Sequence, residues 1–133
     1  MTSFQLTLRI YYEDTDAGGI VYHARYLAFA ERARTEALRQ AGVPLQDLVH
    51  DHGLIFVVRR VEMDYLRPAR LDDEIVVTTG PWEMRGASVE VRQMFEVDGH
   101  TIATMKVKLA TIRMSDGRPV RIPARWRSIG DPG

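Results

Sequence analysis

The fold is decided by residues 12–26, which read YEDTDAGGIVYHARY and join a predicted strand at residues 6–12 to a predicted helix at about residues 24–41. Asp14 and Asp16 are separated by one residue, so both carboxylates would face the same side of an extended segment. The paired glycines after them allow a positive φ or a close approach to a ligand. The helix that follows begins with unpaired N–H groups. A carboxylate beside free N–H donors can activate a nucleophile and hold a developing oxyanion, so this stretch indicates hydrolysis of a carbonyl compound.

The composition is that of an ordinary globular domain and excludes several kinds of site. A chain of 133 residues that is 45% hydrophobic and 27% charged predicts a single domain over residues 1–133. The absence of cysteine excludes a disulfide framework, a thiol nucleophile and a zinc–cysteine site. Since 18 basic residues balance 18 acidic ones, the net charge of 0 indicates no general attraction to nucleic acid or anionic lipid.

The N-terminal residues show neither the basic region nor the apolar run of a signal peptide. No stretch of the chain reaches the ~18 consecutive apolar residues that a membrane span requires. We therefore predict a cytoplasmic protein without a membrane span, in which a few local arginines hold any anionic ligand.

The hydrophobic pattern predicts one long helix and five strands. After the first strand, apolar residues and alanines at spacings of three and four indicate the helix, which Gly42 and Pro44 would end. A short helical turn is expected at residues 46–52. The proline- and arginine-rich tail, residues 118–133, is expected to end in disorder. Four further strands are expected at residues 54–65, 74–82, 89–97 and 103–111.

The order of these elements favours an α+β fold. Runs of strands that follow a single helix, joined by short turns, are typical of an antiparallel sheet rather than of βαβ units. One helix can cover only one face of a five-stranded sheet, so the other face needs cover from elsewhere.

Three stretches carry a family signature: YYEDTDAGGIVYHARYLAFAERARTEAL at residues 11–38, FVVRRVEMDYLRPARLDDE at 56–74 and EMRGASVEVRQ at 83–93. They resemble the hotdog-fold acyl-CoA thioesterases, in the Tol-Pal-associated branch related to 4-hydroxybenzoyl-CoA thioesterase. The resemblance implies a hotdog fold, in which a five-stranded antiparallel sheet wraps around one long helix. It also implies that subunits pair so that the sheet continues across a dimer, with active sites at the subunit boundary and a homotetramer built from such dimers.

The same resemblance implies the chemistry, which is hydrolysis of a short- to medium-chain or aromatic acyl-CoA thioester, with acyl carrier protein as an alternative carrier. A thioester is already an activated acyl group, so no metal or redox cofactor is implied, and coenzyme A is part of the substrate. Asp16 matches the catalytic position of the family's D-x-D loop, where it acts as general base on water or as nucleophile on the carbonyl. Without the resemblance, Asp16 would be interpreted as an Asx-turn residue. Asp14 is expected to hold the loop.

His23 is the second candidate catalytic residue and stands at the expected helix start. Its backbone N–H, at the positive end of the helix dipole, would polarise the thioester carbonyl together with the amides from Val21 onward. Its imidazole would position water or substrate, or would bond to the local backbone. Val21, Tyr22 and Tyr26 are candidates for substrate binding, with the two tyrosines as walls of an acyl pocket or as core residues.

The phosphates of coenzyme A require arginine or a helix N-terminus. Arg85 and Arg121 are the main candidates, because their stretches loosely resemble the coenzyme-binding regions of the hydroxybenzoyl branch. Arg59, Arg60 and Arg67 are further candidates. Each of these arginines is also compatible with a solvated surface position.

Two alternative functions stay open. A hotdog hydratase or dehydratase would place His23 opposite a helix carboxylate, for which Glu31 is the candidate; otherwise Glu31 is a solvated helix residue. A non-catalytic protein that binds acyl thioesters would keep the pocket without turnover. No metal site is predicted, since His50 and His52 offer two ligands without a third.

Overall fold

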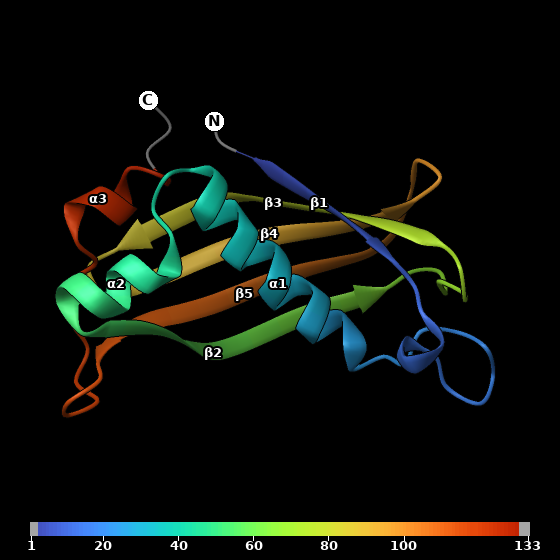
Figure 1. Cartoon of the computed structure of the whole chain (residues 1–133), viewed down its shortest axis with the longest axis horizontal. Coiled ribbons are helices and arrows are strands. Elements are labelled where there is room, and N and C mark those ends of the chain that lie inside the picture. Colours follow the sequence, from blue (N-terminus) through green and yellow to red (C-terminus); the bar gives the residue numbers. More distant parts are fainter. Residues whose placement is uncertain (1–2, 131–133) are drawn as a thin grey trace.

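Five antiparallel strands form one sheet, in the order β1–β3–β4–β5–β2 (Figure 1). The structure is a computed structural model and describes residues 3–130. The strands are β1 Phe4–Arg9, β2 Leu54–Tyr65, β3 Glu74–Arg85, β4 Ser88–Val97 and β5 His100–Arg113. β1 and β2 therefore occupy the two edges of the sheet. The predicted five-stranded antiparallel sheet is confirmed, and β2 has the bounds that its sequence predicts.

Three helices accompany the sheet: α1 Arg25–Gln40, α2 Leu45–His52 and α3 Ala124–Arg127. α1 lies across one face of the sheet, while α2 and α3 lie toward the end of the molecule where α1 finishes (Figure 1). The prediction of one long helix is therefore only partly right, because α1 is 16 residues long and the short helix α3 was not predicted. The short helical turn predicted at residues 46–52 is confirmed by α2. Within the part of the chain that the structure describes, none of the helices is both long and apolar enough to cross a membrane.

α1 begins and ends close to where the sequence predicts. Gly42 takes a positive φ of 79°, and its N–H donates to the carbonyl of Arg39 at 3.0 Å, which ends the helix before Pro44. The buried face of α1 carries small, aromatic and aliphatic residues, together with one arginine: Tyr26, Phe29, Ala30, Ala33, Arg34, Ala37 and Leu38. The core forms between this face and buried strand residues, among them Val77, Val91, Phe95 and Val107.

Gln93 on β4 interrupts this apolar core, as the sequence predicts. Its Nε2 donates to the carbonyl of Ala30 and to Oγ1 of Thr79, both at 2.9 Å, and its Oε1 accepts from Nη1 of Arg34 at 3.0 Å. Because its amide is fully hydrogen-bonded, this buried side chain ties α1 to β3 and β4. Burial also lowers the pKa of the Arg34 guanidinium from its usual value.

The C-terminal tail is ordered farther along the chain than its composition predicts. Trp126 on α3 is completely buried, and its indole Nε1 donates to the carbonyl of Val43 at 3.1 Å. Arg125 beside it donates to the carbonyl of Gly42 at 2.9 Å and to the carboxylate of Asp47 at 3.0 Å. The tail thus fixes the loop that follows α1. Residues 131–133, the end of the tail for which disorder is predicted, lie outside the described residues.

Candidate active site

Asp14 holds the loop between β1 and α1 in place. This residue is only 4% exposed, and its carboxylate accepts hydrogen bonds from the backbone N–H of Tyr11 at 2.8 Å and from Nε and Nη2 of Arg25 at 3.0 and 2.7 Å. Arg25 is the first residue of α1, so the ion pair fastens the loop to the start of the helix. These contacts agree with the structural role expected of Asp14.

The prediction that Asp14 and Asp16 face the same side is wrong. Tyr12–Asp14 form a short 3-10 helix rather than an extended segment, so one carboxylate is buried and the other is exposed. Oδ1 of Asp16 accepts a hydrogen bond from the Gly18 N–H at 2.8 Å, which is an Asx turn. A Cβ atom at position 18 would lie 3.2 Å from this oxygen, so glycine allows the close contact. Within residues 3–130, the structure gives Oδ2 of Asp16 no hydrogen-bond partner.

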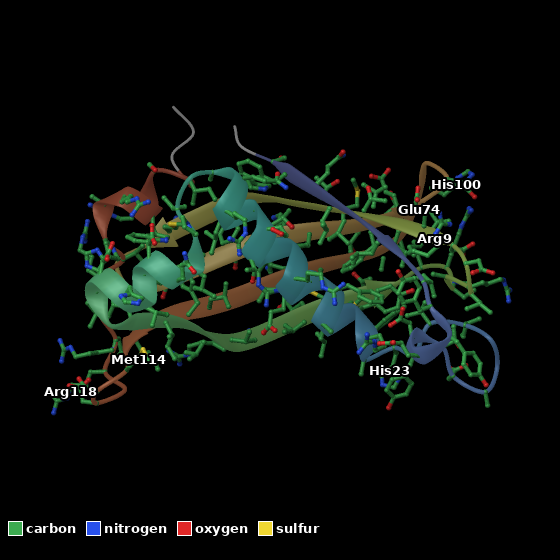
Figure 2. The ribbon with its side chains drawn as sticks, in the orientation of Figure 1. Arg9, His23, Glu74, His100, Met114 and Arg118 are labelled. Carbon is green, nitrogen blue, oxygen red and sulfur yellow. The ribbon has the colours of Figure 1, made fainter. Side chains whose placement is uncertain are left out.

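Asp16 lines an open pocket of about 340 Å³ beside the start of α1. Figure 2 shows His23 at this end of the molecule, opposite the end that carries Met114 and Arg118. The walls come from the motif loop with the first turn of α1 and from the segment around the end of β2: Asp16, Ile20, Val21, His23, Tyr26, Tyr65, Leu66, Arg67 and Pro68. The pocket therefore brings together four of the residues predicted from the sequence, which are Asp16, Val21, His23 and Tyr26.

Two hydrogen bonds join these two regions of the pocket. The N–H of Val21 donates to the carbonyl of Ala69 at 2.8 Å, which pairs the motif loop with the segment after β2. The hydroxyl of Tyr65, the last residue of β2, donates to the carbonyl of His23 at 2.8 Å. The pocket is thus built from parts of the chain that lie about forty residues apart, and both parts are fixed to each other by hydrogen bonds.

The residues just before α1 carry the backbone N–H groups predicted to hold an oxyanion. The N–H groups of Val21 and Tyr22 already donate to backbone carbonyls, at 2.8 and 2.9 Å. The N–H of His23 has no hydrogen-bond partner among the described residues. The predicted set of donors at residues 21–23 therefore reduces to the amide of His23.

Aromatic rings form the apolar side of the pocket. Tyr26 is buried, and its ring meets those of Tyr65 and Phe95 edge-on, with 5.3 Å between centroids in each pair. Burial raises the pKa of both phenols, Tyr26 and Tyr65, so both hydroxyls stay neutral near pH 7. Tyr26 is therefore a core residue that also lines the pocket. Tyr22 contacts the imidazole of His23, with 4.6 Å between centroids, but lies outside the pocket lining.

Residues 11–128 match the family model described as the thioesterase-like superfamily. The chain belongs to this superfamily. The acyl-CoA thioesterase YbgC of Haemophilus influenzae is 42% identical over 120 residues, which cover 90% of this chain and 88% of that protein. The acyl-CoA thioester hydrolase YbgC of Escherichia coli O6:H1 is 50% identical over 92 residues, which cover 69% and 68%. Among solved structures, a probable thioesterase from Bartonella henselae matches with a TM-score of 0.85 at 36% identity, covering 92% of this chain and 100% of that chain.

The thioesterase family predicted from the motif is thereby confirmed, while the association with the Tol-Pal branch stays a prediction. The sequence did not single out the second wall of the pocket. Tyr65, Leu66 and Pro68 were missed there, and Arg67 was proposed only as a phosphate ligand. One feature of the sequence could have indicated this wall: these residues lie in the second family stretch, residues 56–74, where the predicted strand ends.

The two main candidates for binding the phosphates of coenzyme A, Arg85 and Arg121, lie away from the Asp16 pocket. Arg85 is the last residue of β3 and lines a different pocket, together with Glu83, Glu90 and Lys108. Arg121 is exposed and precedes α3. The end of β3 and α3 lie at the end of the molecule opposite the motif loop (Figure 1). Within one chain, the structure therefore does not bring either arginine to Asp16.

Glu31 also lies apart from the Asp16 pocket. It is exposed on α1 and lines a pocket of about 280 Å³ with Arg34, Leu38, Phe56 and Trp82 among its other walls. His23 and Glu31 therefore do not share a pocket within one chain. Among residues 3–130, no three His, Asp or Glu side chains are grouped so that they could hold a metal ion.

Proposed function

We propose that this protein is an acyl-CoA thioesterase that hydrolyses short- to medium-chain or aromatic acyl-CoA thioesters. One observation carries the proposal: the carboxylate of Asp16 and the residue His23, whose N–H has no partner among the described residues, line the same open pocket. The names of the relatives that are 42% and 50% identical, acyl-CoA thioesterase and acyl-CoA thioester hydrolase, support it.

In the proposed reaction, water adds to the carbonyl carbon of the thioester while Asp16 accepts a proton from it as general base. The carbonyl electron pair moves onto oxygen, where the N–H of His23 and the positive end of the α1 dipole stabilise the charge. When this electron pair returns, the C–S bond breaks and the departing thiolate takes the proton from Asp16. The products are a carboxylic acid and the free thiol of coenzyme A, so the proposed step needs no metal or redox cofactor.

A second route through the same residue keeps the same products. Asp16 attacks the carbonyl carbon, the thiolate leaves, and water then cleaves the mixed anhydride on Asp16. Mass spectrometry of a rapidly quenched reaction distinguishes the routes, because only the second one leaves an acyl group on Asp16. General base catalysis predicts that no such adduct accumulates.

The proposed contacts with the substrate follow from the volume and the lining residues of the Asp16 pocket. Its volume of about 340 Å³ lies near the lower end of the range for small-ligand sites, roughly 300–1,000 Å³, which favours a short acyl chain or a single aromatic ring. In this proposal the acyl group lies against Val21 and Tyr26, with Tyr22 near the entrance. Arg67 lines the same pocket, and in this proposal it meets a phosphate or the pantetheine arm of the coenzyme. Arg85 and Arg121 would contribute to this site only from another subunit.

We further propose a dimer that forms through β2. This strand of 12 residues lies at the sheet edge and exposes the apolar side chains of Val58, Val61 and Tyr65, whereas edges that stay solvated avoid such residues. Antiparallel pairing of two β2 strands about Val61 would set Arg60 opposite Glu62 of the partner subunit, a favourable pair of opposite charges. A tetramer of such dimers, and acyl carrier protein as a second acyl donor, stay predictions.

Sedimentation of the wild type and of a Val61→Arg variant tests the dimer. The wild type should sediment as a dimer or a tetramer, because two apolar edges bury each other. Val61→Arg would place two charges at the proposed axis and should shift the protein toward the monomer. A wild type that sediments as a monomer at micromolar concentration would exclude the β2 dimer.

A panel of acyl-CoA substrates tests the function directly. Acetyl-, butyryl-, octanoyl- and benzoyl-CoA are incubated with the protein, and the released thiol is measured by reaction with a disulfide reagent. The wild type should hydrolyse at least one of them, and Asp16→Asn should lose most of that turnover while keeping the fold. If the folded wild type hydrolyses none of these substrates and no acyl carrier protein thioester, the proposed function is contradicted.

The same protein preparations also test the two alternative functions, a hydratase and a non-catalytic binding protein. A hydratase would remove the ultraviolet band of an enoyl-CoA without releasing thiol, and the structure does not favour it because His23 and Glu31 line different pockets within one chain. A non-catalytic binding protein would bind acyl-CoA tightly and release no thiol. The cytoplasmic location stays a prediction.

A further inference from the structure

His23 is held on both of its peptide units. In the unit before it, the carbonyl of Tyr22 accepts a hydrogen bond from the N–H of Arg25 at 2.8 Å. In the unit after it, the carbonyl of His23 accepts one from the hydroxyl of Tyr65 at 2.8 Å. A planar peptide fixes its N–H once its carbonyl is fixed, so the first bond sets the direction of the His23 N–H. The second bond prevents rotation on the other side of the same residue.

The bond from Tyr65 replaces one that the helix does not make. In a regular turn the N–H of Leu27 would donate to the carbonyl of His23, but it donates to the carbonyl of Ala24 at 3.2 Å. Within residues 3–130, the Tyr65 hydroxyl is therefore the only donor to this carbonyl. Its ring is fixed in turn by edge-on contacts, at 5.3 Å from the ring of Tyr26 and 6.4 Å from the imidazole of His23.

We propose that Tyr65 is a positioning residue for the oxyanion donor: its hydroxyl holds the backbone of His23 so that the His23 N–H keeps its direction toward the thioester oxygen. This inference rests on the proposed thioesterase function. An N–H that is fixed before the substrate arrives stabilises the developing charge without reorganisation, which a freely rotating peptide cannot do. This stabilisation acts on the charge that develops in the transition state and not on the bound substrate. Loss of the hydroxyl should therefore lower kcat and leave KM nearly unchanged.

Tyr65→Phe tests the proposal, because it removes the hydroxyl and keeps the ring that packs on Tyr26. On the best acyl-CoA, kcat should fall about ten- to a hundredfold, as for a small misplacement of a catalytic group, while KM changes less than about twofold. Tyr12→Phe is the matched control, since Tyr12 is 84% exposed and lines none of the described pockets. It should keep the wild-type kcat and KM.

A third variant tests the loss of the hydroxyl a second time. Tyr65→His keeps an aromatic ring, but its shorter side chain carries no donor that reaches the carbonyl of His23, so its kcat should also fall. Circular dichroism and thermal unfolding show whether each variant is folded. If Tyr65→Phe fails to fold, the proposal is judged on Tyr65→His, which should then show a lower kcat than wild type at an unchanged KM.

The possible outcomes distinguish a failure of the proposed role of Tyr65 from a failure of the proposed thioesterase function. If the wild type hydrolyses acyl-CoA and folded Tyr65→Phe matches its kcat, the proposed role of Tyr65 is overturned, while the proposed thioesterase function is supported. A loss that appears in KM alone would also overturn it. If the wild type releases no thiol from any substrate, the proposed function fails and this inference fails with it.

Discussion

The two pockets that flank α1 differ in what the backbone of this helix offers to a ligand. The Asp16 pocket lies at the start of the helix, where the N–H of His23 has no hydrogen-bond partner among the described residues. The Glu31 pocket lies against the middle of the helix, where backbone N–H groups are used by bonds within the helix. Its cation, Arg34, is already bonded to Gln93 at 3.0 Å. A carboxylate against the middle of α1 therefore lacks, on that helix, the free backbone N–H that the proposed Asp16 site has just before the helix start.

The largest expected effect separates the two carboxylates. Asp16→Asn should lower kcat on the best acyl-CoA by about 10³-fold, the range for loss of a general base. Glu31→Gln should stay within about threefold, because Glu31 lies outside the Asp16 pocket and the N–H groups of the middle of α1 are used by bonds within the helix. Steady-state thiol release measures both. A larger loss in Glu31→Gln than in Asp16→Asn would move the chemistry to the helix carboxylate.

The next effect concerns stability at the start of α1. Asp14→Ala leaves the Arg25 guanidinium without its buried partner, and we expect the free energy of unfolding to fall by about 2 kcal/mol, less than for a fully buried pair because Arg25 is 34% exposed. Glu13→Ala is the control, since its contact with Arg25 is 3.8 Å long and its side chain is 74% exposed. That change should stay within about 0.5 kcal/mol. Urea unfolding followed by circular dichroism gives both values, and equal values would contradict the role of Asp14.

A smaller effect is expected at the turn that holds Asp16, the proposed general base. Gly18→Ala would place a Cβ atom 3.2 Å from Oδ1 of Asp16, so the carboxylate must shift by a few tenths of an ångström. We expect kcat to fall about three- to tenfold, with almost no change in the free energy of unfolding. Kinetics and urea unfolding on the same preparation test this. Unchanged kcat would show that the exact place of this oxygen is unimportant.

The smallest effect is a decline of stability at high pH. Burial raises the pKa of Tyr26 in the folded protein above its ordinary value of 10.0, so the unfolded chain loses this proton first. The contribution of Tyr26 is therefore complete below about pH 10 and is lost as the pH rises through the folded pKa. Urea unfolding at about pH 8 and about pH 11 should show the decline, and Tyr26→Phe should reduce it. Tyr65, whose pKa burial also raises, contributes in the same direction.

The sequence could predict the half of the pocket that is contiguous in the chain. Asp16, Val21, His23 and Tyr26 lie within eleven residues of one another, so a loop followed by a helix suffices to bring them together. Tyr65 joins them only because β2 passes the start of α1, which depends on the sheet order β1–β3–β4–β5–β2. Local spacing contains no information about that order, and the hydroxyl that reaches His23 could not be predicted from it.

Two failures of prediction have a common physical cause. The rule that alternate residues share a face holds for extended chains, and the 3-10 helix at Tyr12–Asp14 breaks it because Asp14 turns inward to meet Arg25. In the tail, prolines and arginines suggest a solvated segment, yet Trp126 is fully buried and bonded to the carbonyl of Val43. In both places one long-range partner overrides the local pattern.

The ion pair between Asp14 and Arg25 has a consequence for how the enzyme fails on heating. This ion pair holds both the loop that carries Asp16 and the first residue of α1. We therefore expect the loop and the start of the helix to unfold together. If the proposed site is right, a bulky acyl chain should enter by displacing the exposed residues 66–68 rather than the motif loop. Thermal inactivation should accordingly coincide with melting of the helix, instead of preceding it as in enzymes whose catalytic loops are independently mobile.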